Sequence, residues 1–137
     1  DFPRIIDKSD GSAGQNGWTL FINKNSSMNN GRVRFSEDGT NITSYTFSEP
    51  GTWQIWTFTH VKADGAWVWY MNGISDNSGT ATYSIPADEI DAQIGKAWQS
   101  NKKRYKGKIP FVMVYDRALS AAEVKQNFDA LKGRYDL

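Results

Sequence analysis

The chain has 137 residues, of which 39% are hydrophobic and 23% charged, and this composition describes one globular domain rather than a disordered segment or two full domains. Sixteen basic and fifteen acidic residues give a formal net charge of +1, so we expect no nucleic-acid partner and no membrane partner. Cysteine is absent, which excludes disulfides, thiolate zinc sites and cysteine nucleophiles, and favours a bacterial or phage origin.

The first residues, DFPRIID, contain no Met, so we expect a processed product or a fragment of a longer chain. No apolar run approaches the roughly 20 residues of a membrane span, and no signal peptide is evident. We treat residues 1–137 as a single domain.

Short runs of alternating or β-branched and aromatic residues, separated by Gly, Asn, Asp and Ser clusters, are typical of antiparallel strands. The pattern predicts strands at residues 3–8, 17–23, 31–37, 41–47, 53–61, 66–73, 80–85, 91–96 and 107–116. About nine short strands at this spacing predict an all-β sandwich or jelly roll of two antiparallel sheets.

The clearest hairpin covers residues 53–73, where Asp64-Gly65 and Asn72-Gly73 are tight-turn signals. Because successive strand residues point to opposite faces, both faces of this hairpin are apolar. One face is therefore expected to meet the core, and the other to lie under a loop or a helix, or to line a groove.

One helix is predicted near the end of the chain, over residues 119–135. Ser120 and Glu123 fit a capping box, and Leu119 and Val124 fit a hydrophobic staple. Gly133 is expected to end the helix.

The hairpin at 53–73, the Ile-Gly-Lys at 94–96 and the segment 105–128, with its Tyr-Asp-Arg-Ala-Leu-Ser, occur in this order. Together they resemble the laminin-G-like domains of the concanavalin A-like lectin/glucanase superfamily, and the strand, loop and strand before residue 22 also fit. The last 24 residues are similar to copies in structural and tail proteins of marine bacteriophages. The resemblance implies a concanavalin A-like jelly roll with a concave face. Family members usually carry further strands before the segment at 3–8, so N-terminal edge strands are expected to be missing or supplied by a neighbouring chain.

The run ADEIDAQIG resembles the catalytic strand of laminarinase-type glucanases, in which alternate carboxylates project into the cleft. Glu89 and Asp91 fill the first two places, but the third is Gln93, whose amide cannot serve as a catalytic acid or base. His60, the single histidine, has no partner pattern of a triad or a zinc site, and the resemblance implies a structural role for it. We therefore predict no catalytic residues and no enzymatic activity.

Calcium is the cofactor that we predict, with Asp7 and Asp10 as ligands, because hard cations need clustered oxygens on loops and many laminin-G-like domains hold calcium near a sandwich rim. The alternative is that these residues only form a turn.

The segment 96–108, KAWQSNKKRYKGK, is the predicted carbohydrate site. Trp98 and Tyr105 offer aromatic platforms, and Asn101 and Arg104 offer polar contacts among further lysines, a combination suited to a polysaccharide with carboxylate or sulfate groups. The same composition could bind single-stranded nucleic acid, or could be a solvated basic turn with Trp98 in the core.

We accordingly expect a non-catalytic carbohydrate-binding or adhesion module of a larger extracellular or virion-surface protein, with a glycan as partner. The alternative is a structural or assembly domain of a phage particle that contacts other virion or cell-surface proteins. A glucanase or lyase is the third reading, disfavoured because its set of carboxylates is incomplete.

Overall fold

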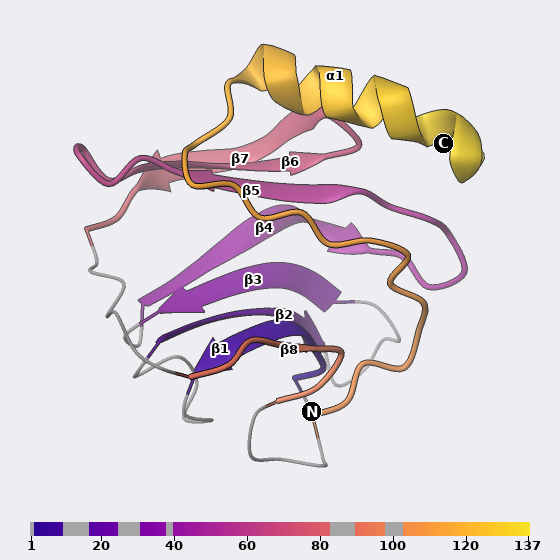
Figure 1. Ribbon diagram of the computed structural model, residues 1–137, viewed down its shortest axis with the longest axis horizontal. Coiled ribbons are helices and arrows are strands. Elements are labelled where there is room, and N and C mark those ends of the chain that lie inside the picture. The colour runs from indigo at the N-terminus through magenta and orange to yellow at the C-terminus, as the bar shows by residue number, and fades with distance from the viewer. Residues whose placement is uncertain (1, 10–16, 25–30, 38–39, 83–89, 98–102) are drawn as a thin grey trace.

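The computed structural model describes residues 2–9, 17–24, 31–37, 40–82, 90–97 and 103–137. Two antiparallel sheets and one helix form three stacked layers (Figure 1). The strands are β1 (Arg4–Ser9), β2 (Gly17–Lys24), β3 (Gly31–Glu37), β4 (Thr40–Ser48), β5 (Trp56–His60), β6 (Ala66–Met71), β7 (Ile74–Thr80) and β8 (Gln93–Ile94), and the helices are α1 (Ala121–Leu131) and the 3-10 turn η1 (Lys132–Arg134).

The larger sheet has the strand order β4-β3-β2-β1-β8, and the smaller one the order β5-β6-β7. Every neighbouring pair is antiparallel. This architecture confirms the predicted all-β sandwich of two antiparallel sheets with a short C-terminal helix.

The core lies between the two sheets. Val33 and Phe35 of β3 and Ile42 of β4 meet Trp69 of β6, and the rings of Phe35 and Phe58 stack with centroids 4.5 Å apart. The indole of Trp69 is fully buried, and its Nε1–H donates to the carbonyl of Ile42 at 3.3 Å. The polar end of this large side chain is thus satisfied inside the core.

The opposite face of the smaller sheet packs under the C-terminal helix (Figure 1). Tyr70 and Val68 of β6 contact Leu119 and Val124, all within a second apolar cluster. Both apolar faces of the hairpin are therefore in contact with other elements, as predicted. One face packs against the larger sheet and the other against the C-terminal helix.

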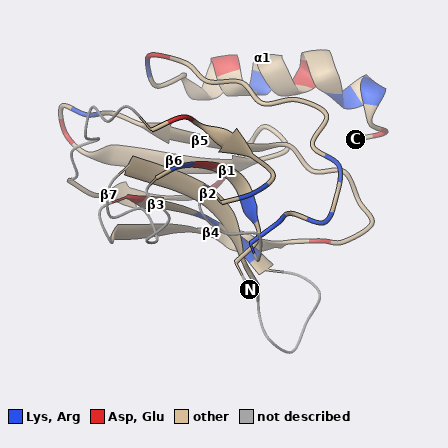
Figure 2. Ribbon diagram, turned by 60° about the horizontal axis from the view of Figure 1, so that its bottom comes forward, with Lys and Arg blue, Asp and Glu red and all other residues tan. Residues whose placement is uncertain are grey.

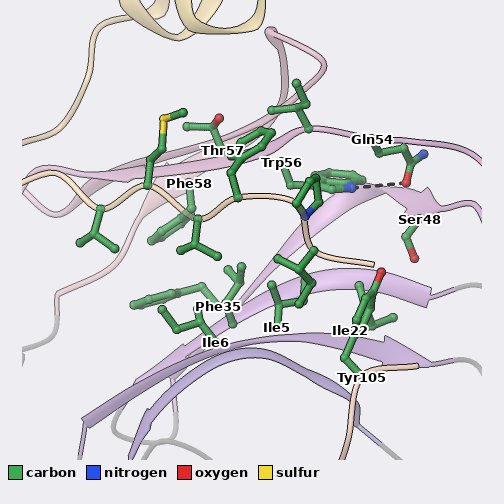
Figure 3. A pocket seen from close by; sticks show the side chains of 18 of the residues that line it. Ile5, Ile6, Ile22, Phe35, Ser48, Gln54, Trp56, Thr57, Phe58 and Tyr105 are labelled. Atoms are coloured by element: carbon green, nitrogen blue, oxygen red, sulfur yellow. Dashed lines mark hydrogen bonds between the residues drawn. The ribbon is translucent and has the colours of Figure 1, made fainter. Parts of the chain in front are cut away.

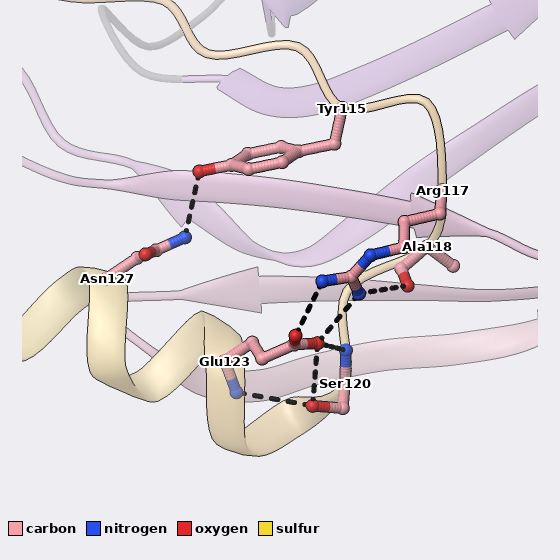
Figure 4. Close-up of polar contacts among 6 residues, drawn as sticks. All are labelled: Tyr115, Arg117, Ala118, Ser120, Glu123 and Asn127. Atoms are coloured by element: carbon pink, nitrogen blue, oxygen red, sulfur yellow. Dashed lines mark hydrogen bonds and ion pairs between the residues drawn. The ribbon is translucent and has the colours of Figure 1, made fainter.

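The capping box of α1 is present in both directions, because the Ser120 hydroxyl accepts from the Glu123 amide and the Glu123 carboxylate accepts from the Ser120 amide (Figure 4). The helix ends at Leu131, so Gly133 lies in the following 3-10 turn rather than ending the helix as predicted. Within the described residues, no helix has the length and apolar character that a membrane span requires.

Two predicted turns also form. Asn72 and Gly73 both have positive φ values, +51° and +76°, and they join β6 directly to β7. This geometry matches the two-residue hairpin turn that twists with its strands. Gly65, with φ +74°, follows Asp64 in the turn between β5 and β6.

One predicted strand is wrong, and one strand was not predicted. The unpredicted strand is β7, which forms because the two-residue turn lets pairing with β6 resume immediately, and its polar sequence ISDNSGT gives no strand signal. Residues 83–85 of the strand predicted at 80–85 lie outside the described residues. Residues 107–116, although rich in β-branched and aromatic side chains, form no strand and run as an extended connection toward α1. Pro110 has no N–H to give to a ladder. Strands β5 and β8 are shorter than the predicted 53–61 and 91–96.

The two sheets are joined along one side by side chains of β7. The Asp76 carboxylate accepts from the backbone amides of Tyr45 and Thr46 on the edge strand β4, at 2.6 and 3.0 Å. Asn77 donates to the carbonyl of Thr43 at 2.9 Å. These contacts close the sandwich between β4 and β7.

Candidate functional site: an inter-sheet groove with a basic rim

A large groove opens between the two sheets, on the side away from the contact between β4 and β7 (Figure 3). Its volume is about 1510 Å³. Ile5, Ile22 and Phe35 project into it from the larger sheet, and Trp56 and Phe58 project from β5 on the other side. The walls of the groove are therefore apolar and aromatic, as ligand-binding clefts generally are.

Polar groups are placed among these aromatic side chains near one end of β5. The Oε1 atom of Gln54 accepts from the indole Nε1–H of Trp56 at 3.4 Å and from the amide of Glu49 at 3.1 Å. Ser48 lies nearby, and its hydroxyl donates to the carbonyl of Gly31 at 2.6 Å. The amide of Gln54 can hydrogen-bond a ligand hydroxyl as donor or acceptor.

An aromatic cluster forms another part of the lining. The ring of Tyr135 lies 5.3 Å from that of Trp53 and 5.8 Å from that of Phe111. Trp53 remains 37% exposed. Rings that are fixed by neighbouring rings and still exposed can stack against a flat ligand at little entropic cost.

The basic segment 103–108 forms the rim of the groove, and Figure 2 shows its cations along the connection that leads toward α1. The segment is tied to the larger sheet by two backbone hydrogen bonds, Arg4 N–H to Lys103 O at 3.1 Å and Tyr105 N–H to Gly95 O at 2.8 Å. The predicted site residues Arg104 and Tyr105 both line the groove, Arg104 exposed and Tyr105 half-buried.

The Tyr105 ring lies directly against Gly107, where an added Cβ would come within 2.6 Å of the ring. A side chain at position 107 would thus have to displace the ring, so glycine permits this close packing. Lys106 and Lys108 are exposed on the same rim. Trp98 and Asn101, the other two predicted carbohydrate contacts, lie outside the described residues.

Asp7, the first predicted calcium ligand, lies in β1 with a fully buried side chain. Its Oδ2 atom is 3.4 Å from Nε of Arg4, and its Oδ1 atom accepts from the Ser9 hydroxyl at 2.5 Å. Burial lowers the pKa of Arg4, and the charge of Asp7 opposes that shift. Asp10 is outside the described residues, and no cluster of three or more candidate metal-ligating side chains occurs among those described. Calcium binding stays a prediction.

Of the run that resembles a glucanase strand, Glu89 is outside the described residues, Asp91 is exposed, and Gln93 pairs with Asp7 across β8 and β1. His60 is half-buried at the end of β5, opposite Trp67, and contributes to the groove lining. The structure therefore brings Arg104 and Tyr105 together with the groove, while Asp7 lies within the sheet.

The sequence alone did not identify Trp53, Gln54 and Trp56 as groove residues. The alternation of residues in the hairpin placed Trp56 on an apolar face. Which of the two apolar faces remains accessible to solvent depends on how the two sheets pack, and this packing involves residues far apart in the sequence. The one available signal was the aromatic density on both faces of the hairpin.

The matching family model is Laminin_G_3, described as the concanavalin A-like lectin/glucanases superfamily, and it matches residues 1–125. A search of curated proteins found no match. Among solved structures, the 2.1 Å crystal structure of an S-layer domain-containing protein (residues 221–444) from Clostridium thermocellum is similar, with 24% identity and a TM-score of 0.49.

That similarity covers 85% of this chain, which spans 58% of the length of the S-layer domain-containing chain. The match of the family model is independent of it and extends over most of the sequence, including every strand described above. The chain belongs to the laminin-G-like domains of the concanavalin A-like lectin/glucanases superfamily.

Proposed function

We propose that this domain is a non-catalytic carbohydrate-binding module of an extracellular protein, and that the saccharide lies in the inter-sheet groove. Membership of the laminin-G-like family fits an extracellular module of the adhesion type. The observation that carries the proposal is the groove itself, because exposed aromatic rings and an amide line a cleft whose rim is basic.

Each feature of the groove has a counterpart in sugar chemistry. Trp53, Trp56 and Tyr105 offer ring faces to the apolar C–H faces of a pyranose, and Gln54 offers an amide to its hydroxyls. Arg104 and its neighbouring lysines favour a chain that carries carboxylate or sulfate groups. An acidic polysaccharide is thus the proposed ligand class.

The absence of catalysis is also part of the proposal. It is supported by Gln93 at the third place of the run that resembles a glucanase strand. Release of reducing sugar from laminarin, abolished by Glu89→Gln, would contradict it. Display on a virion surface and calcium dependence stay predictions, and a glycan array with and without EDTA tests the second.

The direct test is an array of neutral and acidic polysaccharides followed by titration of the best binder. Tyr105→Ala and Arg104→Gln are each expected to weaken binding about tenfold, the equivalent of roughly 1.4 kcal/mol. The matched control is Arg134→Gln, which removes the same charge from an exposed position outside the groove lining. Equal losses for Arg104→Gln and Arg134→Gln would mean that the rim acts only through net charge.

A second candidate function is an assembly domain that contacts protein. One observation favours it: Val112, Met113, Val114 and Tyr115 are 37–72% exposed along an extended segment that forms no strand. Exposed extended segments of this kind are suited to pairing with another chain. Failure to bind any glycan, together with a concentration-dependent increase in mass by light scattering, would favour this candidate over the first.

A further inference from the structure

The outer face of the larger sheet carries a second cationic and aromatic surface, on the side opposite the groove. It consists of Arg32 and Arg34 of β3 and Thr43, Tyr45 and Phe47 of β4, and we name it the Arg32 face. Because strand residues alternate, the two arginines point away from Val33 and Phe35, which face the core. Tyr45 is 70% exposed, so this face is open to solvent there.

An irregularity in β4 shapes this face. Arg34 pairs with Thr43 and Arg32 with Phe47, so three residues of β4 stand opposite the single residue Val33. The Ser44 hydroxyl fills the gap in the ladder by accepting from the Val33 amide at 3.0 Å and donating to the carbonyl of Thr46 at 2.9 Å. Bulges of this kind redirect side chains, and they are common beside functional sites.

The bulge places two rings on one guanidinium. The centre of the Arg32 guanidinium lies 5.7 Å from the ring centroid of Tyr45 and 4.8 Å from that of Phe47. The Asp76 carboxylate of β7 restrains the backbone of the bulge, because it accepts hydrogen bonds from the amides of Tyr45 and Thr46. The arginine is thus held by stacking on a backbone that is itself restrained.

Within the part of the chain that the structure describes, this surface has no paired carboxylate. Among the described residues, no carboxylate forms an ion pair with Arg32 or Arg34, and the Nε atom of Arg32 is buried without a hydrogen-bond partner. Arg34 donates from Nε to the Thr43 hydroxyl at 3.0 Å. A guanidinium that stacks on two rings and pairs with no carboxylate among the described residues complements a planar anion.

We propose that the Arg32 face is a second binding site for an acidic polysaccharide, in which a uronate carboxylate or a sulfate ester pairs with Arg32 and the sugar ring stacks on Tyr45. This surface is separate from the groove, and the group that it binds is a specific anion. The exposed Tyr45 ring beside the guanidinium supplies the sugar platform that an isolated anion would not use.

A polysaccharide fits this face better than a nucleic acid. Tight binding to a phosphate backbone needs several neutralising cations, whereas this face has two and the whole chain has a net charge of only +1. A uronate chain such as polygalacturonate carries a single carboxylate on each sugar ring, so the two arginines can match neighbouring rings.

The test compares binding of polygalacturonate and heparin oligosaccharides with binding of neutral dextran by the whole chain. Arg32→Gln is expected to weaken binding of an acidic probe about tenfold, the equivalent of roughly 1.4 kcal/mol, because a charge-assisted hydrogen bond is lost. Arg134→Gln is expected to weaken it less than about twofold. Arg32→Lys retains the charge but loses the planar fork, so we expect it to weaken binding as well. Tyr45→Ala, at an exposed side chain, provides a variant in which the fold is not at risk.

Circular dichroism melting confirms that each variant is folded. Equal effects of Arg32→Gln and Arg134→Gln, or unchanged binding by folded Tyr45→Ala and Arg32→Lys, would overturn the proposal. So would competition by single-stranded DNA or polyglutamate as strong as that by the acidic sugars, since the face would then recognise charge alone. If Tyr105→Ala weakened binding of the acidic probe and Arg32→Gln did not, the site on the Arg32 face would be rejected and the groove site would stand. If Arg32→Gln weakened binding and Tyr105→Ala did not, the groove site would be rejected and the site on the Arg32 face would stand.

Discussion

At the scale of single residues, the buried pair of Arg4 and Asp7 shows how context changes the role of a carboxylate. In the sequence, Asp7 stands beside a loop rich in oxygen ligands, which suggests a cation site. In the structure, its side chain is 0% exposed and that of Arg4 is 2% exposed. Both charges have left water, so each depends on the other to offset the cost of burial.

Asp7→Asn should therefore destabilise the fold strongly, by about 3–5 kcal/mol, because it leaves the Arg4 charge buried without its partner. Chemical denaturation of the variant and the parent measures this difference. Asp91→Asn, at an exposed carboxylate, is the matched control and should leave stability almost unchanged. If EDTA lowered the melting temperature of the parent and had no effect on Asp7→Asn, Asp7 would be a metal ligand instead.

At the scale of elements, the sequence predicted the turns and helix caps that depend on neighbouring residues. The Asn72-Gly73 turn and the capping box of Ser120 and Glu123 depend on residues close in sequence, and both form as expected. The strand β7 was not predicted because its side chains are polar, and Asp76 and Asn77 contact another sheet rather than a core. The apolar residues of 107–116 predicted a strand, but the segment forms none and lines the groove instead.

The capping box leads to a prediction about pH. Hydrogen bonds from Arg117, and then from Ser120, lower the pKa of Glu123 from its ordinary 4.5 to about 2 (Figure 4). These hydrogen bonds stabilise the ionised carboxylate in the folded state only. The contribution of Glu123 to folding stability is therefore fully present above pH 4.5 and is lost as the pH falls toward 2.

Glu123→Gln should lower the melting temperature near neutral pH, and the difference from the parent should shrink steadily between pH 4.5 and pH 2. Thermal melts over this pH range measure the effect, and Glu49→Gln, at an exposed carboxylate, is the control. A difference that stays constant down to pH 2 would show that the ionised carboxylate of Glu123 does not stabilise the helix.

At the scale of the whole molecule, the sequence predicted the sandwich because hydrophobic periodicity and turn signals determine layers. It did not predict the groove, which exists because β7 closes the sandwich against β4 on one side only. Arg104 and Tyr105 were identified from composition, whereas Trp53 and Gln54 required the tertiary structure. The alternation in GRVRFSE did place Arg32 and Arg34 on one face, but the bulge that brings Tyr45 to Arg32 has no local signature.

Nuclear magnetic resonance of the indole N–H groups can decide whether a saccharide occupies the inter-sheet groove. On titration with the best binder from the array, the signals of Trp53 and Trp56, which line the groove, should shift. The signal of Trp69 should not shift, because its indole is fully buried and donates a hydrogen bond to the carbonyl of Ile42. Saturable binding that leaves both groove indoles unchanged would contradict the account.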